Sequence, residues 1–289
     1  ITAKISTEGW ITFLNQRGEV LTAEYWRNRD RINRYCVPLR VPARELKPIP
    51  GGTYAVSDAL LADLKAGVQG QHASNLGGLI AREIGDELGI PSYIVDPVVI
   101  DEMADVARYA GHPLFQRVSI FHALNQKAVA KRFAKEQGKK YEELNLIVCH
   151  MGGGVSVAAH EQGRVVDVFN VKDEGSMGLD RGGALPVNAL INYCFSGKTK
   201  EEVKRTFGRR AGMFSYLGTT DFRVICAKVV EGDEKFTEAY RALVYQLAKD
   251  IGAMAAVLHF NVDAIIYTGG MAYEQSFCDD ITAYVGRLA

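Results

Sequence analysis

The fold is decided by residues 144–169, which read LNLIVCHMGGGVSVAAHEQGRVVDVF. An apolar run from Leu144 to Cys149 leads through His150 into three consecutive glycines, and a second, alternating run spans residues 155–159. A turn at Gly163 then precedes a third run over residues 165–169. Strand-sized runs separated by glycine turns are typical of a β-meander, which we predict for this stretch.

The first turn, Gly152-Gly153-Gly154, is unusual because three consecutive residues lack a Cβ. Ordering such a segment costs more conformational entropy than ordering other residues, so the turn needs a reason. One reading is that backbone amides approach phosphate oxygens there. The other is a tight hairpin or bulge, in which glycine is also common. The spacing alone leaves both readings open.

Two later segments favour the phosphate reading. Residues 175–183 form a glycine-rich loop that carries one arginine, Arg181. Residues 264–267 read as a buried strand that leads into Thr268, Gly269 and Gly270. A strand followed by two glycines before a helix is a second candidate nucleotide contact.

The chain resembles the acetate and butyrate kinases, which belong to the sugar kinase, Hsp70 and actin ATPase superfamily. The resemblance runs from about residue 47 to the end and rests on ordered motifs, namely KPIPGGTY (47–54), HASNLGG (72–78), DPVV (96–99), SIFHALNQ (119–126), HMGGG (150–154), the loop through Arg181, YLGT (216–219) and TGG (268–270). It implies an α/β fold with the two lobes of the actin-like ATPase (ribonuclease H-like) type, incomplete at both ends. We expect a first lobe on the acyl side over residues 46–143 and a nucleotide-binding lobe over residues 144–289.

Residues 1–45 do not fit this family and form a foreign, β-hairpin-like segment. They read as strand, turn and strand between Trp10 and Tyr25. Residues 24–29, EYWRNR, weakly resemble the N-terminal β-domain of the retaining α-glucosidase and α-xylosidase family. We interpret the segment as a strand pair with a solvated basic face, and leave open whether it is a natural fusion.

The resemblance implies reversible phosphoryl transfer between ATP and a short-chain carboxylate, butyrate or a branched acid, giving an acyl phosphate and ADP. It assigns Mg²⁺ to Asp96, a hydrogen bond with the transferring phosphoryl group to His122, and a clamp on that group to Arg181. It also implies nucleotide contacts for His150, Gly152, Gly153, Gly154, Ser156, Gly269, Gly270 and Met271.

The residues themselves allow plainer readings. Asp96 ends the apolar run 93–95, a suitable place for a metal ligand, but an acid before Pro97 is also a common turn former. A lone histidine such as His122 is more often structural than catalytic, and His160 has no functional context. The acidic residues Asp101, Glu102 and Asp105 read as the start of a helix, without a chemical role.

Capping residues and apolar spacing predict the helices. One begins after Ser57, one runs from Ser74 or Asn75 to Leu88, and one follows His122. Others are expected at residues 187–194, 200–203 and 233–258. The tetrad 196–199, SGKT, is not a Walker loop, because it lacks the earlier glycine and does not follow a strand.

Composition excludes several protein classes. The 289 residues carry 34 basic and 34 acidic side chains, and this balance argues against a nucleic-acid partner. Five scattered cysteines without a C-x-x-C pair favour reduced thiols in a cytosol. No 18-residue apolar run is present. We expect a cytoplasmic homo-oligomer with no membrane partner.

Two other functions stay open on this evidence. The family's opening phosphate loop, a Gly-Arg-Gly-Gly turn and a late carboxylate are not found, so the chain could be a remnant that binds nucleotide without turnover. A non-catalytic sugar-binding or assembly module built on residues 1–45 is the second alternative.

Overall fold

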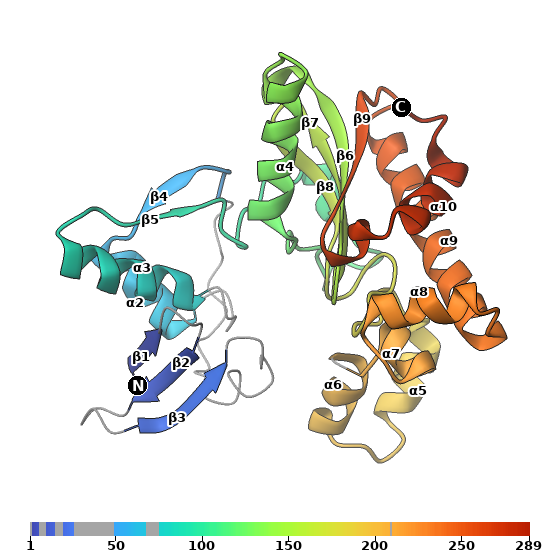
Figure 1. Ribbon diagram of the computed structural model, residues 1–289, viewed down its shortest axis with the longest axis horizontal. Helices are drawn as coiled ribbons and strands as arrows, with labels where there is room; N and C mark the ends of the chain where they lie inside the picture. The colour runs from blue at the N-terminus through green and yellow to red at the C-terminus, as the bar shows by residue number, and fades with distance from the viewer. Residues whose placement is uncertain (1, 6–9, 15–19, 26–48, 68–74, 209) are drawn as a thin grey trace. The chain divides into compact units, whose positions relative to one another are not determined.

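The computed structural model describes residues 2–5, 10–14, 20–25, 49–67, 75–208 and 210–289. The chain divides into two compact units (Figure 1). The first unit comprises residues 1–47 and 52–95, and the second comprises residues 48–51 and 96–289. The predicted division into an N-terminal segment and two lobes stays a prediction.

The described residues of the first unit form two small sheets and two helices. Strands β1 (Thr2–Ile5), β2 (Trp10–Leu14) and β3 (Val20–Tyr25) pair antiparallel in the order β1-β2-β3. The predicted strand pair between residues 10 and 25 is thus confirmed, whereas β1 was not predicted. Strand β4 (Thr53–Ala55) pairs antiparallel with β5 (Tyr93–Val95), which ends just before Asp96 as expected.

The helices of the first unit begin where their caps predict. Helix α2 (Asp58–Ala66) starts after Ser57, whose Oγ accepts a hydrogen bond from the Leu60 amide at 3.2 Å. That bond satisfies one of the amides that a helix N-terminus leaves without an intrahelical partner. Helix α3 (Asn75–Leu88) follows.

The second unit is built on a four-stranded sheet in the order β8-β7-β6-β9. Strands β6 (Asn145–Met151), β7 (Val155–Glu161) and β8 (Arg164–Phe169) pair antiparallel in sequence order, so the predicted meander is confirmed. Strand β9 (Ala264–Thr268) lies parallel to β6, with Thr268 opposite His150. The two strand ends that precede glycines therefore meet at one edge of the sheet.

Helices cover both faces of this sheet (Figure 1). Because side chains alternate along a strand, Ile147, Cys149 and Met151 of β6 face one way and pack in the core beneath α9 (Glu234–Val257) and α10 (Gln275–Val285). Leu146 and Val148 face the other way, toward α4 (Ala123–Glu136). A sheet buried on both faces explains why its strands read as nearly continuous apolar runs.

The remaining elements connect this framework. The helices predicted at residues 187–194, 200–203 and 233–258 are confirmed as α5 (Val187–Cys194), α6 (Lys200–Gly208) and α9, and α6 extends five residues beyond the predicted end. The helix predicted after Asp101 is wrong: residues 101–104 are irregular, and only a single 3₁₀ turn, η1, follows. The other elements of the second unit are η1 (Asp105–Arg108), η2 (Tyr141–Glu143), α5 (Val187–Cys194), α6 (Lys200–Gly208), α7 (Gly212–Leu217), α8 (Phe222–Val230) and η3 (Gly270–Tyr273).

Within the described ranges, no helix combines the length and the apolar character that crossing a membrane requires.

Candidate functional site

Two histidines stack on each other at the edge of the sheet. His122 immediately precedes α4 and His150 lies near the end of β6, with ring centroids 3.7 Å apart and planes 11° from parallel. Burial lowers the pKa of His150 to about 4, because the charged imidazolium loses its hydration there. His150 is therefore neutral at pH 7. The structure brings together two residues for which sequence resemblance implied phosphoryl and nucleotide roles.

Helix α4 holds His150 through Asn125. The Asn125 Oδ1 lies 2.8 Å from His150 Nδ1 and accepts a hydrogen bond from Thr268 Oγ1 at 3.0 Å. Asn125 thus joins α4 to the ends of both β6 and β9. It belongs to the motif SIFHALNQ but carried no individual role in the sequence analysis.

Ser156 lies beneath the histidine pair. Ser156 is 1% exposed. Its Oγ lies 2.8 Å from His122 Nδ1 and 2.9 Å from Gln126 Nε2. The hydroxyl therefore contacts protein groups on α4 and in the loop before it. A contact between Ser156 and nucleotide stays a prediction.

The glycine turn between β6 and β7 packs against the loop that carries Arg181. The carbonyls of Gly152 and Gly153 accept hydrogen bonds from the amides of Leu179 and Asp180 at 3.3 and 3.2 Å. A Cβ on Gly154 would lie 3.1 Å from Arg181 Nη1. The missing side chains thus allow close packing between turn and loop.

The same turn also has amides that the fold does not use. Among the described residues, the N–H groups of Gly153 and Gly154 donate no hydrogen bond. Adjacent amides without a protein partner suit phosphate oxygens, which accept several such bonds at once. The turn is therefore a tight hairpin, as one sequence reading had it, and a contact between its amides and phosphate stays a prediction.

A buried carboxylate holds the start of the Arg181 loop. Asp250 of α9 accepts a hydrogen bond from the Ser176 amide at 2.6 Å. Burial raises the pKa of the Asp250 carboxyl to about 6, although hydrogen bonds from Ser176 act in the opposite direction. This carboxylate is a structural anchor for the loop that the sequence did not indicate.

The second glycine turn has one constrained and one open position. Gly269 has φ +90°, and a Cβ there would lie 2.5 Å from the carbonyl oxygen of Met151. Nothing lies within 4 Å of a Cβ on Gly270. Met271 is 0% exposed and packs in the core, so its predicted nucleotide contact stays a prediction.

Asp96 contacts helix α4. Its carboxylate is 2% exposed and pairs with Lys131 Nζ of α4 at 3.0 Å. No contact among the described residues joins Asp96 to His122 or Arg181. A shielded carboxylate that already faces an ammonium group does not fit a metal ligand as it stands. Within the described residues, no cluster of three or more His, Cys, Asp or Glu side chains could hold a metal ion.

Sequence reasoning missed two buried polar groups. His160 is 0% exposed, with Nδ1 2.7 Å from Tyr141 Oη and Nε2 3.1 Å from Gln126 Oε1. The alternation along β7 could have indicated it, since His160 follows Ser156 by four residues and must share its face. Glu102 is the other: it forms a buried ion pair with Lys127 at 2.7 Å, and no local pattern signals such a partner.

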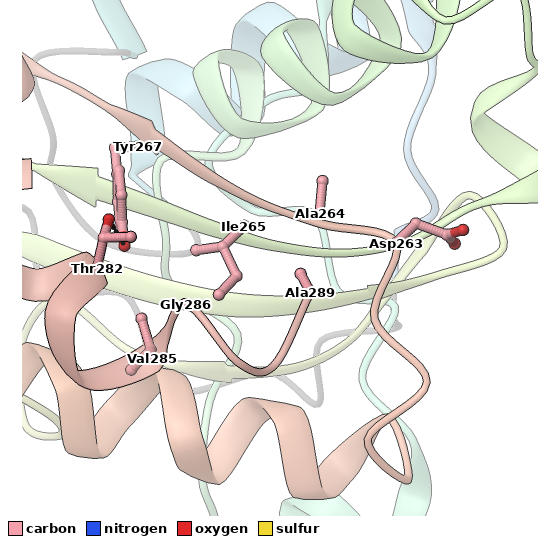
Figure 2. Close-up of a pocket in the computed structure, with 8 residues that line it drawn as sticks. All are labelled: Asp263, Ala264, Ile265, Tyr267, Thr282, Val285, Gly286 and Ala289. Carbon is pink, nitrogen blue, oxygen red and sulfur yellow. Dashed lines mark hydrogen bonds between the residues drawn. The ribbon is translucent and has the colours of Figure 1, made fainter. Parts of the chain in front are cut away.

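A separate hollow of about 310 Å³ lies between β9 and α10 (Figure 2). Its lining is mostly apolar, and none of the candidate catalytic or nucleotide-binding residues contributes to it. The lining residues are Asp263, Ala264, Ile265, Tyr267, Thr282, Val285, Gly286 and Ala289.

Comparison with known sequences identifies close relatives. The profile described as the Acetokinase family matches residues 107–283. The chain is 56% identical over 246 residues to "Butyrate kinase 1" of Clostridium acetobutylicum, a match that covers 84% of this chain and 69% of the relative. It is 53% identical over the same length to "Butyrate kinase 2" of that organism, again with 84% and 69% coverage.

Solved structures agree in fold. The acetate kinase of Porphyromonas gingivalis superposes with a TM-score of 0.73 at 19% identity and covers 96% of this chain and 78% of its own. A propionate kinase from Francisella tularensis gives a TM-score of 0.68 at 20% identity, covering 82% of this chain and 64% of its own. The predicted actin-like ATPase architecture is thereby confirmed.

Proposed function

The chain belongs to the acetokinase family, and we propose that its carboxylate kinase activity acts on butyrate, giving butyryl phosphate and ADP from butyrate and ATP. Members of this family transfer phosphoryl groups to short-chain carboxylates. The choice of butyrate is supported by the names of relatives that are more than half identical to this chain. The observation in this structure that supports the proposal best is the stacked pair of His122 and His150, which lies between the start of α4 and the end of β6, beside the glycine turn.

The reaction needs positioning and charge neutralisation more than covalent help from the protein. A carboxylate oxygen attacks the γ-phosphorus of ATP, the bond to the β–γ bridging oxygen breaks, and ADP leaves with that electron pair. Negative charge is spread over the three equatorial oxygens during transfer. Groups that donate hydrogen bonds to those oxygens therefore contribute most.

The candidate residues suit these tasks. The unused amides of Gly153 and Gly154 would bind phosphate oxygens, and the planar fork of Arg181 would contact the transferring group. His122 would donate a hydrogen bond to the same group. The first turn of α4, directly after His122, adds the favourable field of a helix N-terminus for an anion. We place the base and ribose of the nucleotide near Gly269, Gly270 and Met271.

Magnesium accompanies ATP in phosphoryl transfer of this kind and neutralises phosphate charge. The Asp96 carboxylate faces Lys131 in this structure. Metal binding by Asp96 stays a prediction. The homo-oligomeric state and the cytoplasmic location also stay predictions.

The test is a hydroxamate assay, which traps the acyl phosphate, with ATP, Mg²⁺ and either butyrate, isobutyrate or acetate. We expect the highest kcat/KM with butyrate. If another acid gives the highest kcat/KM, that acid replaces butyrate as the proposed substrate, and the reaction type is unchanged. A nucleotide-induced rise in melting temperature without turnover on any of the three acids would instead support the nucleotide-binding remnant.

A further inference from the structure

A chain of hydrogen bonds runs through the layer between α4 and the sheet and ends at His122. Tyr141 Oη lies 2.7 Å from His160 Nδ1, and His160 Nε2 lies 3.1 Å from Gln126 Oε1. Gln126 Nε2 lies 2.9 Å from Ser156 Oγ, which in turn lies 2.8 Å from His122 Nδ1. His160 and Gln126 are 0% exposed and Ser156 is 1% exposed, so water does not compete for these bonds.

The orientation of the Gln126 amide is fixed by a group that can only accept. Its Nε2 also lies 3.1 Å from the backbone carbonyl oxygen of Ser156. A flipped amide would place Oε1 against that carbonyl and leave two acceptors facing each other without a hydrogen. Nε2 must therefore face Ser156, and Oε1 must face His160.

This orientation sets the protons on either side of Gln126. His160 Nε2 faces an acceptor, so it carries the hydrogen, and Nδ1 accepts from the Tyr141 hydroxyl. Burial and the nearby Lys127 lower the pKa of His160 to about 3, so the ring is neutral and has only one N–H.

On the other side, the Ser156 hydroxyl already accepts from Gln126 Nε2 and has one hydrogen to donate. Among its contacts, only His122 Nδ1 can accept it, since the remaining contact is the His122 amide at 3.4 Å, which donates. A hydrogen on Nδ1 would leave the buried hydroxyl proton without an acceptor, a state that costs free energy.

We propose that Gln126 and Ser156 are positioning residues that hold His122 as the neutral tautomer protonated at Nε2. In this tautomer Nε2–H is the donor of the ring, and the ring is oriented by the bond at Nδ1. The use of that donor on the transferring phosphoryl group rests on the proposed function. The tautomer itself does not, because it follows from the protein contacts alone.

The direct test is two-dimensional ¹H–¹⁵N NMR of the wild-type protein with ¹⁵N-labelled histidine at pH 7.5, without substrate. Cross-peak patterns and nitrogen shifts distinguish the two neutral tautomers and the cation. The spectrum of His122→Asn identifies the His122 signals by their loss. We expect one Nε2–H tautomer. A signal from the Nδ1–H tautomer or from the cation would overturn the proposal. This NMR measurement requires no turnover, so it tests the tautomer even if butyrate is not the substrate.

Variants test the assignment to Ser156. Ser156→Ala should give a mixture of His122 tautomers and lower kcat on the order of tenfold, the effect of one lost orienting hydrogen bond, while KM for ATP stays near wild type. Ser156→Thr keeps a hydroxyl and should recover both readouts. An unchanged tautomer and an unchanged kcat in Ser156→Ala would overturn the role.

Ser215→Ala, at an exposed serine outside the hydrogen-bond chain, is the control for loss of a serine hydroxyl. It removes a serine hydroxyl that donates only to a backbone carbonyl within its own helix, that of Gly212 at 2.7 Å. A purely structural role of Ser156 would lower stability and leave the His122 signals unchanged. That outcome would also overturn the proposal.

Discussion

Arg181 lies against the glycine turn, where its side chain is 37% exposed. Its Nη1 would be 3.1 Å from a Cβ on Gly154, so the guanidinium lies beside the amides proposed to bind phosphate. The fork of an arginine matches two oxygens of a phosphoryl group at once, whereas lysine presents a single point charge.

We therefore predict that Arg181→Lys lowers kcat on the order of a hundredfold or more while changing ATP affinity far less. The reason is that the guanidinium stabilises the negative charge on the equatorial phosphoryl oxygens during transfer. Steady-state kinetics and ATP titration measure the two effects. Equal losses in kcat/KM and in affinity would make Arg181 a ground-state binding residue instead.

His160 supports a prediction about acid stability. Its pKa lies near 3 in the folded protein, against an unfolded value of 6.5, so the unfolded chain binds the extra proton between these values. The free energy of unfolding should thus fall on acidification below about pH 6.5, by about 1.4 kcal/mol per pH unit for this residue.

In His160→Gln this contribution disappears, so the difference in unfolding free energy between pH 7 and pH 5 should shrink by about 2 kcal/mol. Urea unfolding at the two pH values measures it. Asp250, whose pKa is raised to about 6 by burial, acts in the opposite direction, but it is common to both proteins and cancels. An identical pH dependence would show that His160 is not buried as a neutral ring.

At the scale of elements, α4 assembles the site. Successive residues of its first two turns point to different partners: Asn125 to His150, Gln126 to Ser156 and Lys127 to Glu102. Lys131, one turn later, contacts Asp96. The two glycine turns complete the arrangement from the ends of β6 and β9.

Gly153 permits a test of the first turn as a phosphate site. A Cβ there would lie 3.3 Å from Asp180 Oδ1, a contact that small shifts can absorb. Gly153→Val should therefore fold but cover the amides, and the ATP-induced rise in melting temperature should disappear. Gly252→Ala in α9, where nothing lies within 4 Å, is the control that should keep the rise. A rise of unchanged size in Gly153→Val would remove the turn from the site.

The second turn offers a matched pair of neighbours. Gly269→Ala places a Cβ at φ +90° and 2.5 Å from the Met151 carbonyl oxygen, so the backbone must move. We expect a loss of about 2–4 kcal/mol in unfolding free energy. Gly270→Ala meets open space and should change it by less than about 0.5 kcal/mol. Equal values for the two variants, measured by urea unfolding, would contradict this account.

At the scale of the whole second unit, Glu102 and Lys127 join distant parts of the chain. Glu102 also accepts hydrogen bonds from the amides of Gly51 and Val165, at 2.6 and 2.9 Å, and Lys127 donates to the carbonyl of Gly163. Burial alone raises the pKa of Glu102, but the bonds from Lys127 and the two amides lower it overall.

We predict that Glu102→Gln destabilises the unit by about 3–5 kcal/mol, because it leaves a buried ammonium group without its counter-charge. The double variant Glu102→Gln/Lys127→Met should lose less than the sum of the single variants. Glu136→Gln, which breaks the exposed pair with Arg132 on the same helix, should have no measurable effect. Urea unfolding of the wild type and the four variants decides, and additive losses would mean that the two groups are not coupled.

The sequence by itself determined the strands of the central sheet, several helices and the family. The strands β6, β7, β8 and β9 follow from apolar runs and glycine turns, and α2 follows from the cap at Ser57, because these signals lie within a few residues of what they specify. The long ordered motifs were enough to identify the acetokinase family, which the relatives confirmed.

Only the tertiary structure decided which polar groups meet. Gln126 and Ser156 are 30 positions apart in the sequence. The separation is 35 positions for Asp96 and Lys131, and 63 positions for Glu102 and Val165. Local patterns carry no information about such pairs, so His160 read as incidental and Glu102 as a helix start. Their roles arise because packing α4 on the sheet removes water from these groups, and a buried polar group must then find its partner within the protein.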